Sequence, residues 1–474
     1  MRLPSAVGHH RPDTGDPTGC RPAPNVVAGV RHHRAVTRTS AQDNLRLPTV
    51  APVDDVLADL AWRGLLALTT DRDALAKDLA SGPVTLYCGF DPTGDSLHVG
   101  SLVPLLALRR FQLAGHRPIA LAGGATGFIG DPSGRSSERT LMTADVVAER
   151  VTLIRAQLER YLEFSDAPNG AILADNLEWT APLTVIDFLR DVGKHFPVNQ
   201  MLARESVRAR LESGGLSFTE FSYQLLQSLD FLELHRRYGC TLQVGATDQW
   251  GNITAGLDYL RRVDQVAGHA LTFPLITDAN GHKLGKSTGG GNVWLDPAMT
   301  SPYALYQFAL NVDDRDVGTY LRLLTFVGRE EVESLDARTA ERPHERAAQR
   351  RLAGELVALV HGADEVGRVE AASAALFGGG ALADLDERTL VAALAEAPSL
   401  TVSGDCPPVV DLLAEGLGLS RSDARRTVKE GGAYLNNTKV TDELAVPAEH
   451  DWLHGRFLVL RKGKRNVLVV HRTP

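Results

Sequence analysis

The sequence predicts an α/β protein whose largest part is a doubly wound, mostly parallel sheet. From about Val53 to about Thr277, short apolar runs alternate with longer segments of helical periodicity. Polar and glycine-rich residues gather where the apolar runs end. At 474 residues the chain is too long for one hydrophobic core, so we expect about two to four domains.

The elements of the α/β domain follow one another as strand, helix, strand. The expected strands are Thr85–Gly89, Pro118–Ala122, Ala171–Asn176, Thr241–Gly245 and Leu271–Thr277. The expected amphipathic helices are Leu102–Ala114, Ala144–Glu163, Leu183–Val192 and Phe218–Arg237. This alternation is typical of a parallel sheet with helices on both faces, where ligands bind outside the carboxyl ends of the strands.

The pattern changes twice after this domain. We expect the α/β domain over residues 51–295, a helical domain over 296–396, a linker over 397–405 and a small α+β domain over 406–474. The linker prediction rests on the stretch APSLTVSGDCPP, which is rich in small residues and proline. The segment from Asp405 onward contains 11 Lys and Arg residues and 9 Asp and Glu residues, so it is basic in an otherwise acidic protein.

Composition excludes several classes of protein. The chain is 43% hydrophobic and 23% charged, and it has no uninterrupted apolar stretch long enough to span a membrane. Its net charge of −8 argues against a coat that binds nucleic acid over the whole surface. The four cysteines are scattered and form no C-x-x-C pair, which favours the cytoplasm and no structural zinc.

Residues 1–50 differ from the rest of the chain. They are rich in Arg, His, Pro and Thr, and they lack apolar periodicity and the apolar core of a secretory signal. We expect a disordered N-terminal extension. An arginine-rich targeting segment and an over-long start site are the alternatives.

One motif lies where the first strand of the sheet meets a helix, in the stretch YCGFDPTGDSLHVGS from Tyr87 to Ser101. A helix start after such a turn presents backbone N–H groups and the positive end of a dipole, which suits phosphate. Thr93 and His98 can add side-chain donors, and Gly100 would let a flat base approach the backbone. The alternative is an ordinary strand-to-helix turn with a buried histidine.

A second motif, DANGHKLGKSTGGG, follows the last strand. It places Lys283 and Lys286 three residues apart among glycines, with Ser287 next, as suits binding of a polyphosphate, although a solvated turn would use the same residues. Together, and about 185 residues apart, the two motifs resemble the HIGH and KMSKS signatures of class I aminoacyl-tRNA synthetases. Ser101 stands where that signature usually has its second histidine, so we expect activity to depend more on His98.

Three further stretches resemble bacterial tyrosyl-tRNA synthetases. They are GGATGFIGDPSGRSSERT from Gly123, TEFSYQLLQSLDFL from Thr219 and GATDQWGNI from Gly245. In the second stretch, Tyr223, Gln227 and Asp230 recur at helical spacing among apolar neighbours. Such a polar stripe predicts a cavity wall, with a hydrogen-bonded core cluster as the alternative. The resemblance extends from about Val53 to the C-terminus and implies a Rossmann-like catalytic domain and a homodimer.

The resemblance also implies roles for individual residues. Those implied for the substrate tyrosine are Tyr87 and Asp230 at its phenol, Tyr223, Gln227 and Asp131 at its ammonium group, and Gln249. Those implied for ATP are Gly89, Asp91, Thr93, His98, Gly100, Gly245, Asp248, Lys283, Lys286 and Ser287. Cys88 would lie beside the ribose, although its sequence context suits an ordinary buried cysteine equally well. His98, Thr93 and the two lysines would be catalytic. Arg135 and Arg139 contact pyrophosphate or RNA, or are solvated.

The C-terminal segment resembles the S4 RNA-binding module. Arg421, Arg425, Arg426 and Lys429 recur at helical spacing and form a basic face suited to phosphates, although a charge run is usually only a solvated surface.

The activity implied by the resemblance is the joining of L-tyrosine to tRNA(Tyr). ATP is a substrate accompanied by Mg²⁺, and no tightly bound cofactor is expected. The alternatives are a tryptophanyl enzyme of the same architecture, a small nucleotidylyltransferase, and a catalytically inactive RNA-binding paralogue.

Overall fold

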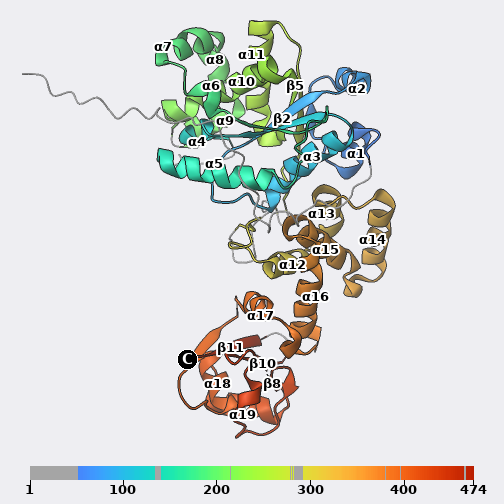
Figure 1. Ribbon diagram of the computed structural model, residues 1–474, viewed down its shortest axis with the longest axis vertical. Coiled ribbons are helices and arrows are strands. Elements are labelled where there is room, and N and C mark those ends of the chain that lie inside the picture. The colour runs from blue at the N-terminus through green and yellow to red at the C-terminus, as the bar shows by residue number, and fades with distance from the viewer. Residues whose placement is uncertain are drawn as a thin grey trace, which may run out of the picture. The chain divides into compact units, whose positions relative to one another are not determined.

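The structure is a computed structural model that describes residues 52–133, 140–213, 215–277, 279, 281, 292–378, 380–395, 397–463 and 466–473 (Figure 1). The expected N-terminal extension over residues 1–50 lies outside these ranges. Within the described ranges, no helix combines the length and apolar character needed to cross a membrane.

A six-stranded sheet forms the centre of the α/β domain, in the order β1-β6-β5-β2-β3-β4. Neighbouring strands from β6 to β4 are parallel, and β1 is antiparallel at the edge. The strands are β1 (Leu68–Thr69), β2 (Thr85–Phe90), β3 (Arg117–Ala122), β4 (Ile172–Asp175), β5 (Cys240–Ala246) and β6 (His269–Phe273). The predicted doubly wound, mostly parallel sheet is therefore confirmed.

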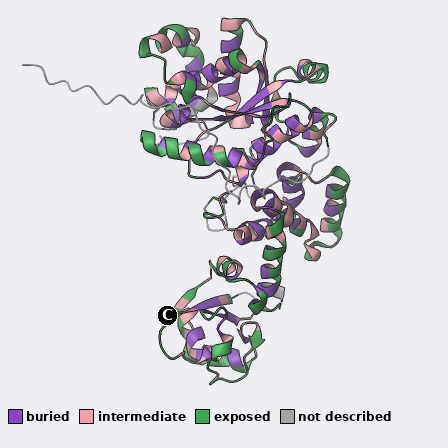
Figure 2. Cartoon of the chain, viewed as in Figure 1, coloured by how far each residue is buried: buried purple, intermediate pink, exposed green. Residues whose placement is uncertain are grey.

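Helices cover both faces of this sheet (Figure 1). On one face, α3 (Leu102–Leu113) and α5 (Ala144–Leu158) share an apolar cluster with Leu86 and Cys88 of β2. On the other face, α10 (Phe218–Tyr238) and α11 (Trp250–Asp264) share a second cluster with Tyr87. Successive side chains of a strand point to opposite faces, so β2 contributes to both layers. Figure 2 shows the strands buried between these helices.

Capping residues mark both ends of α10. The Ser217 side chain accepts a hydrogen bond from the Glu220 amide at 3.2 Å, and Gly239 ends the helix with a φ of 66°. Most residues from Glu220 to Leu234 are buried, and Tyr223, Gln227 and Asp230 in this stretch line a cavity.

Two expected helices differ in the structure. The segment Leu183–Val192 is not one amphipathic helix, because α7 (Val185–Asp187) passes into a wider π-turn over Phe188–Val192. Val185 and Ile186 are 73% and 67% exposed, so their apolar pattern does not reflect packing in a core. The helix expected to reach Glu163 ends at Leu158.

Several helices and one strand of this domain were not predicted from the sequence. The longest is α11, and β1 has only two residues, too few to show a period. Strand β6 ends four residues before the predicted Thr277, because Pro274 follows it and cannot donate a ladder hydrogen bond. The remaining helices of this domain are α1 (Val56–Arg63), α2 (Arg72–Ser81), α4 (Thr126–Ile129), α6 (Leu177–Thr180), α8 (Val198–Leu202) and α9 (Glu205–Ser213).

The next segment is helical, as expected from its periodicity. Its helices are α12 (Pro302–Leu310), α13 (Val317–Leu324), α14 (Arg329–Glu341), α15 (Ala347–His361), α16 (Ala363–Gly378) and α17 (Glu387–Leu394). Helix α12 begins with Ser301 as its cap and Pro302 in its first turn, two features that favour a helix start.

A second sheet, of order β7-β11-β10-β8-β9, forms the C-terminal part. Its elements are β7 (Ser399–Val402), α18 (Val409–Gly416), α19 (Arg421–Lys429), β8 (Ala433–Leu435), β9 (Thr438–Lys439), β10 (Phe457–Lys462) and β11 (Asn466–Arg472). Within the segment predicted to be a linker, β7 pairs in parallel with β11. Ser399–Val402 is therefore a strand of this sheet. Its residue pattern is too short to be identified as a strand from the sequence unless its partner is known.

Side chains of the C-terminal part cap the end of α16. Arg461 donates to the Leu376 carbonyl at 2.7 Å, and Asn437 donates to the carbonyls of Ala375 and Gly380 at 2.5 and 2.7 Å. These donors satisfy carbonyl groups that a helix end leaves unpaired.

Candidate active site

A cavity of about 420 Å³ opens at the carboxyl ends of β2 and β5, as expected for a parallel sheet. It brings together all the described residues that the sequence places at the substrates. They are Tyr87, Gly89, Asp91, Thr93, His98, Gly100, Asp131, Tyr223, Gln227, Asp230, Gly245, Asp248 and Gln249. The strand ends, the loop before α3 and one face of α10 supply most of this lining.

At the floor of the cavity lies Asp230, a buried carboxylate on α10. It accepts hydrogen bonds from Asn176 Nδ2 at 3.0 Å and from Trp179 Nε1 at 2.9 Å. Burial raises its pKa to about 7, although both donors act in the opposite direction. A carboxyl group in this state can exchange a proton or a hydrogen bond with a ligand near neutral pH.

The hydroxyl of Tyr87 faces the same site from β2. It is buried and has no hydrogen-bond partner among the described residues. Burial, followed by the charge of Asp230, raises the pKa of this phenol well above its ordinary value. The Tyr87 ring packs edge-on against the Phe231 ring, with 5.4 Å between the ring centroids, and this contact fixes the orientation of the Tyr87 side chain. An unpaired buried hydroxyl is costly unless a ligand satisfies it.

A second group of polar side chains lies around Asp91 and Asp131. Tyr223 donates its hydroxyl to Asp91 Oδ2 at 2.8 Å, and Thr126 donates to Asp91 Oδ1 at 2.7 Å. Gln249 Nε2 donates to Asp131 Oδ2 at 2.6 Å. The two carboxylates make this part of the cavity suited to a cation such as an ammonium group.

Gln227 lies one turn before Asp230 on the same helix. Its side-chain oxygen is buried and unpartnered among the described residues. It is therefore an additional acceptor available to a ligand with N–H groups.

Glycines in the stretch GGATG let these acids approach the backbone. A side chain at Gly123 would collide with Asp91, and one at Gly124 would collide with Asp175. The stretch thus owes two of its glycines to close contacts at the strand ends.

The loop that carries His98 is held by a second segment of the chain. The Val99 amide donates to the Val293 carbonyl at 2.9 Å, and the Leu295 amide donates to the Leu97 carbonyl at 2.8 Å. The Trp294 ring lies edge-on to His98, with 6.4 Å between ring centroids. His98 Nδ1 is buried without a described partner, and burial lowers the pKa of the ring.

Ser101 stabilises the start of this turn. Its amide donates to the His98 carbonyl at 2.7 Å, and its hydroxyl accepts a long hydrogen bond from the His98 amide at 3.4 Å. The cavity lining includes Ser101 as well as His98.

Some expected site residues lie outside the described residues. They are Lys283, Lys286, Ser287, Arg135 and Arg139. Three residues that support the site were not predicted from the sequence, namely Asn176, Trp179 and Thr126. Asn176 ends a predicted strand, so its position at a carboxyl strand end was a usable signal, whereas Trp179 and Thr126 offered none.

The basic face of α19 is only partly paired. Arg421 forms an ion pair with Asp411 at 2.5 Å, and Arg426 forms one with Asp423 at 2.8 Å. Arg425 and Lys429 are exposed and form no ion pair with another described residue.

The sequence matches the family described as tRNA synthetases class I (W and Y) over residues 79–378. It also matches the Tyrosine--tRNA ligase SYY-like C-terminal domain over residues 390–470. The chain is 60% identical over 422 residues to a Tyrosine--tRNA ligase of Streptomyces coelicolor, covering 88% of this chain and 99% of that protein. The chain belongs to the bacterial tyrosyl-tRNA synthetases.

Other members of the synthetase family give the same result. A Tyrosine--tRNA ligase of Nocardia farcinica is 58% identical, again over 88% of this chain and 99% of the relative. A C-terminally truncated mitochondrial tyrosyl-tRNA synthetase of Coccidioides posadasii superposes with a TM-score of 0.59 at 32% identity, covering 67% of this synthetase and 91% of that structure. The fold class and family expected from the sequence are therefore confirmed.

Proposed function

We propose that this protein is a tyrosine--tRNA ligase that works in the cytoplasm. It activates L-tyrosine with ATP and then transfers the tyrosine to the 3′ end of tRNA(Tyr). The observation that carries this proposal is the buried pair of Tyr87 and Asp230, one of which lacks a partner until a ligand arrives. The 57–60% identity to curated tyrosine--tRNA ligases supports it independently.

The cavity floor explains why the substrate is tyrosine. The phenolic hydroxyl of the substrate would complete the hydrogen bonding of Tyr87 and Asp230. Phenylalanine would leave the Tyr87 hydroxyl buried and unsatisfied, at a cost of about 1–3 kcal/mol, and would give Asp230 no hydrogen bond beyond those from Asn176 and Trp179. Asp131, Tyr223 and Gln227 would bind the ammonium group, with Gln249 beside them. Because Tyr223 bonds to Asp91, we place the Asp91 carboxylate near this ammonium group as well as near the nucleotide.

The first chemical step needs no covalent intermediate with the enzyme. An oxygen of the tyrosine carboxylate attacks the α-phosphorus of ATP, the bond to the β-phosphate breaks, and pyrophosphate leaves. The protein holds the two reactants in line and stabilises charge on the leaving group. We assign Thr93, His98, Lys283 and Lys286 to that charge, and Gly89, Gly100, Gly245, Asp248 and Ser287 to the nucleotide.

Mg²⁺ enters with ATP as a substrate ion in this proposal. In the second step a hydroxyl of the terminal ribose of tRNA attacks the tyrosyl carbonyl carbon, and AMP leaves. No residue of the enzyme is acylated in either step.

The C-terminal part is proposed to bind the tRNA. Arg425 and Lys429 are the better candidates for phosphate contacts, because Arg421 and Arg426 are already paired with carboxylates. Replacing Arg425 and Lys429 with alanine should weaken tRNA binding and reduce its salt dependence, with tyrosine activation unchanged. Unaltered salt dependence would contradict this assignment.

We also propose a homodimer. Exposed apolar side chains are frequent in the part of the sequence from α7 to the start of α10, and they include Val185, Ile186, Leu189, Val198, Leu202 and Phe218. Phe218 is 74% exposed, which is unusual for a large apolar residue unless another surface covers it. Ile186→Asp should yield monomers in sedimentation, and a dimer that persists unchanged would rule out this surface.

The decisive experiment is ATP–pyrophosphate exchange with each amino acid in turn. Exchange that requires tyrosine supports the proposal, and exchange that requires tryptophan would favour the tryptophanyl alternative. Absence of any exchange would favour an inactive RNA-binding paralogue. Lys286→Ala should slow exchange by orders of magnitude while tyrosine affinity stays nearly constant.

A further inference from the structure

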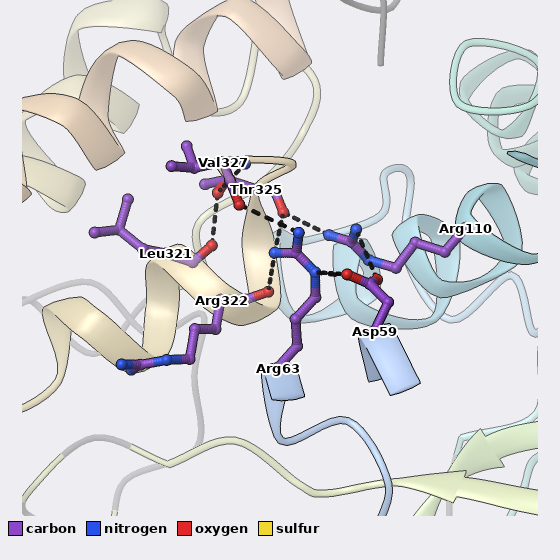
Figure 3. Close-up of polar contacts among 7 residues, drawn as sticks. All are labelled: Asp59, Arg63, Arg110, Leu321, Arg322, Thr325 and Val327. Atoms are coloured by element: carbon purple, nitrogen blue, oxygen red, sulfur yellow. Dashed lines mark hydrogen bonds and ion pairs between the residues drawn. The ribbon is translucent and has the colours of Figure 1, made fainter. Parts of the chain in front are cut away.

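Three charged side chains meet in the interior where α1, α3 and the end of α13 come together (Figure 3). Arg63 ends α1, Asp59 lies one turn before it, and Arg110 lies near the end of α3. Arg63 is 5% exposed and Arg110 is 1% exposed. Buried charges require partners, so this cluster calls for an explanation.

Arg63 connects α1 to the residues that follow α13. Its Nε donates to Asp59 Oδ1 at 2.9 Å. Its Nη1 donates to the carbonyls of Arg322 and Thr325 at 3.1 and 3.3 Å, and its Nη2 donates to that of Val327 at 3.2 Å. One side chain thus bridges segments more than 250 residues apart in the sequence.

Arg110 makes the corresponding connection from α3. Its Nη1 donates to Asp59 Oδ2 at 3.3 Å, and its Nη2 donates to the Thr325 carbonyl at 2.5 Å. Its guanidinium also lies over the Phe326 ring, 4.5 Å from the centroid. We call Asp59, Arg63 and Arg110, with the carbonyls of Arg322, Thr325 and Val327, the charged joint.

The charges of the joint do not cancel within the α/β domain. Two guanidinium groups share a single carboxylate, and burial together with the charge of Arg63 lowers the pKa of Arg110 to about 9. The remaining compensation comes from carbonyl groups at the negative end of α13. The second cation is therefore satisfied only while the helical domain occupies its place.

The receiving turn is itself well fixed. Thr325 is fully buried, and its hydroxyl donates to the Leu321 carbonyl at 2.6 Å and accepts from the Val327 amide at 3.2 Å. Figure 3 shows Thr325 bonded to Leu321 within the turn whose carbonyl groups accept hydrogen bonds from the two arginines. The carbonyls are therefore held in one direction before the arginines bind them.

Helix α3 connects the joint to the active site. It begins at Leu102, directly after the turn that holds His98, and Arg110 lies in its last turn. Most of its residues are buried, including Leu102, Leu105 and Leu106. A rigid, buried helix therefore carries the proposed nucleotide turn at one end and the contact to the helical domain at the other.

We propose that the charged joint positions the helical domain relative to the active site, and that it acts in the transfer of tyrosine to tRNA rather than in tyrosine activation. The inference rests on the proposed function. A tRNA held by the C-terminal part and also by the active site gains from two contacts only if their separation is fixed. The C-terminal part caps α16 of the helical domain, so that separation depends in part on the joint, which adds directed hydrogen bonds to the apolar cluster shared by the two domains.

Arg110→Met is the variant that tests this inference. It replaces a buried cation with an apolar side chain of similar length, and it leaves Asp59 paired with Arg63, so no buried charge is left without a counter-charge. Tyrosine-dependent pyrophosphate exchange should stay within about twofold of the unaltered protein. The kcat/KM for charging full-length tRNA should fall about tenfold or more, because a misplacement near 1 Å is costly in an oriented reaction.

A short RNA hairpin separates positioning from a general loss of activity. A hairpin with only the acceptor stem and 3′ end contacts the active site alone, so Arg110→Met should charge it within about twofold of the unaltered protein. Arg329→Met is the matched control, since Arg329 lies in an exposed ion pair with Glu333 on α14 and should change none of these rates.

Equal losses for hairpin and full-length tRNA would overturn the inference, and so would full charging of tRNA. If Arg110→Met does not fold, Arg110→Lys takes its place, because one ammonium group cannot reproduce the fork that reaches Asp59 and Thr325. Failure of the unaltered protein to exchange pyrophosphate with tyrosine would instead contradict the proposed function.

Discussion

The cavity floor and the charged joint both bury charged side chains, yet they satisfy them differently. In the joint, every nitrogen of Arg63 has an acceptor, and only Nε of Arg110 lacks one among the described residues. At the cavity floor, the Tyr87 hydroxyl and the Gln227 oxygen have none, and the Asp230 pKa is raised to about 7. The joint is complete in the protein alone, whereas the cavity is complete only with a ligand.

Buried polar groups therefore have two different roles in this protein. A satisfied network specifies how helices fit together, and an unsatisfied one holds free energy that a ligand can recover. Mutations should therefore lower stability in the joint and lower activity in the cavity.

The largest effect is expected from Asp230→Asn. Loss of the carboxylate should reduce kcat/KM for tyrosine at least about 100-fold, because a charged hydrogen bond to the substrate phenol disappears. This change can be measured by pyrophosphate exchange. Activity within a few-fold of the unaltered protein would show that Asp230 does not contact the substrate.

The same substitution should change how stability depends on pH. Burial raises the Asp230 pKa above that of the unfolded chain, so the folded state holds a proton that the unfolded chain loses. The stability of the unaltered protein therefore falls as the pH rises from about 4 to about 7, by about 1–4 kcal/mol for this group. Because asparagine does not titrate, urea unfolding at pH 5 and pH 8 should show a smaller difference between the two pH values in Asp230→Asn than in the unaltered protein.

The next effect tests the joint. Asp59→Asn leaves two buried guanidinium groups without a counter-charge, which should lower the free energy of unfolding by about 3 kcal/mol. Thermal unfolding measures it, with Asp258→Asn as the control in an exposed ion pair. Equal, small losses for the two variants would mean that the joint contributes no more than a surface pair.

A smaller effect is expected from Tyr87→Phe. The variant loses one hydrogen bond to the substrate but no charge, so kcat/KM for tyrosine should fall about tenfold to 100-fold. The preference for tyrosine over phenylalanine should narrow by a similar factor in a competition assay. An undiminished preference would assign the discrimination to Asp230 alone.

The smallest effect is expected at Ser101. Its long hydrogen bond to the His98 amide stabilises a turn, so Ser101→Ala should slow exchange less than about fivefold. His98→Ala should be far more damaging, because it removes the side chain that lines the cavity. Similar losses for the two variants would contradict this division of roles.

The sequence predicts elements and faces better than it predicts contacts between them. Helical periodicity placed Tyr223, Gln227 and Asp230 on one face of α10, where the structure has them. It could not reveal Asn176 or Trp179, because they reach Asp230 from another part of the fold. The contacts of the charged joint could not be predicted from the sequence for the same reason.

Local patterns also mislead where the partner is distant or absent. Leu183–Val192 has the apolar spacing of a packed helix, although it exposes most of its apolar side chains and changes helical type. Ser399–Val402 resembles a linker until β11, some 70 residues later, supplies its hydrogen bonds.

Burial determines how readily the thiol of Cys88 reacts. This free thiol lines the cavity from β2, and burial raises its pKa to about 12. Near pH 7 only about one molecule in 10⁵ carries the reactive thiolate. Peroxides and alkylating agents should therefore attack this residue more slowly than an exposed cysteine, although it lines the cavity.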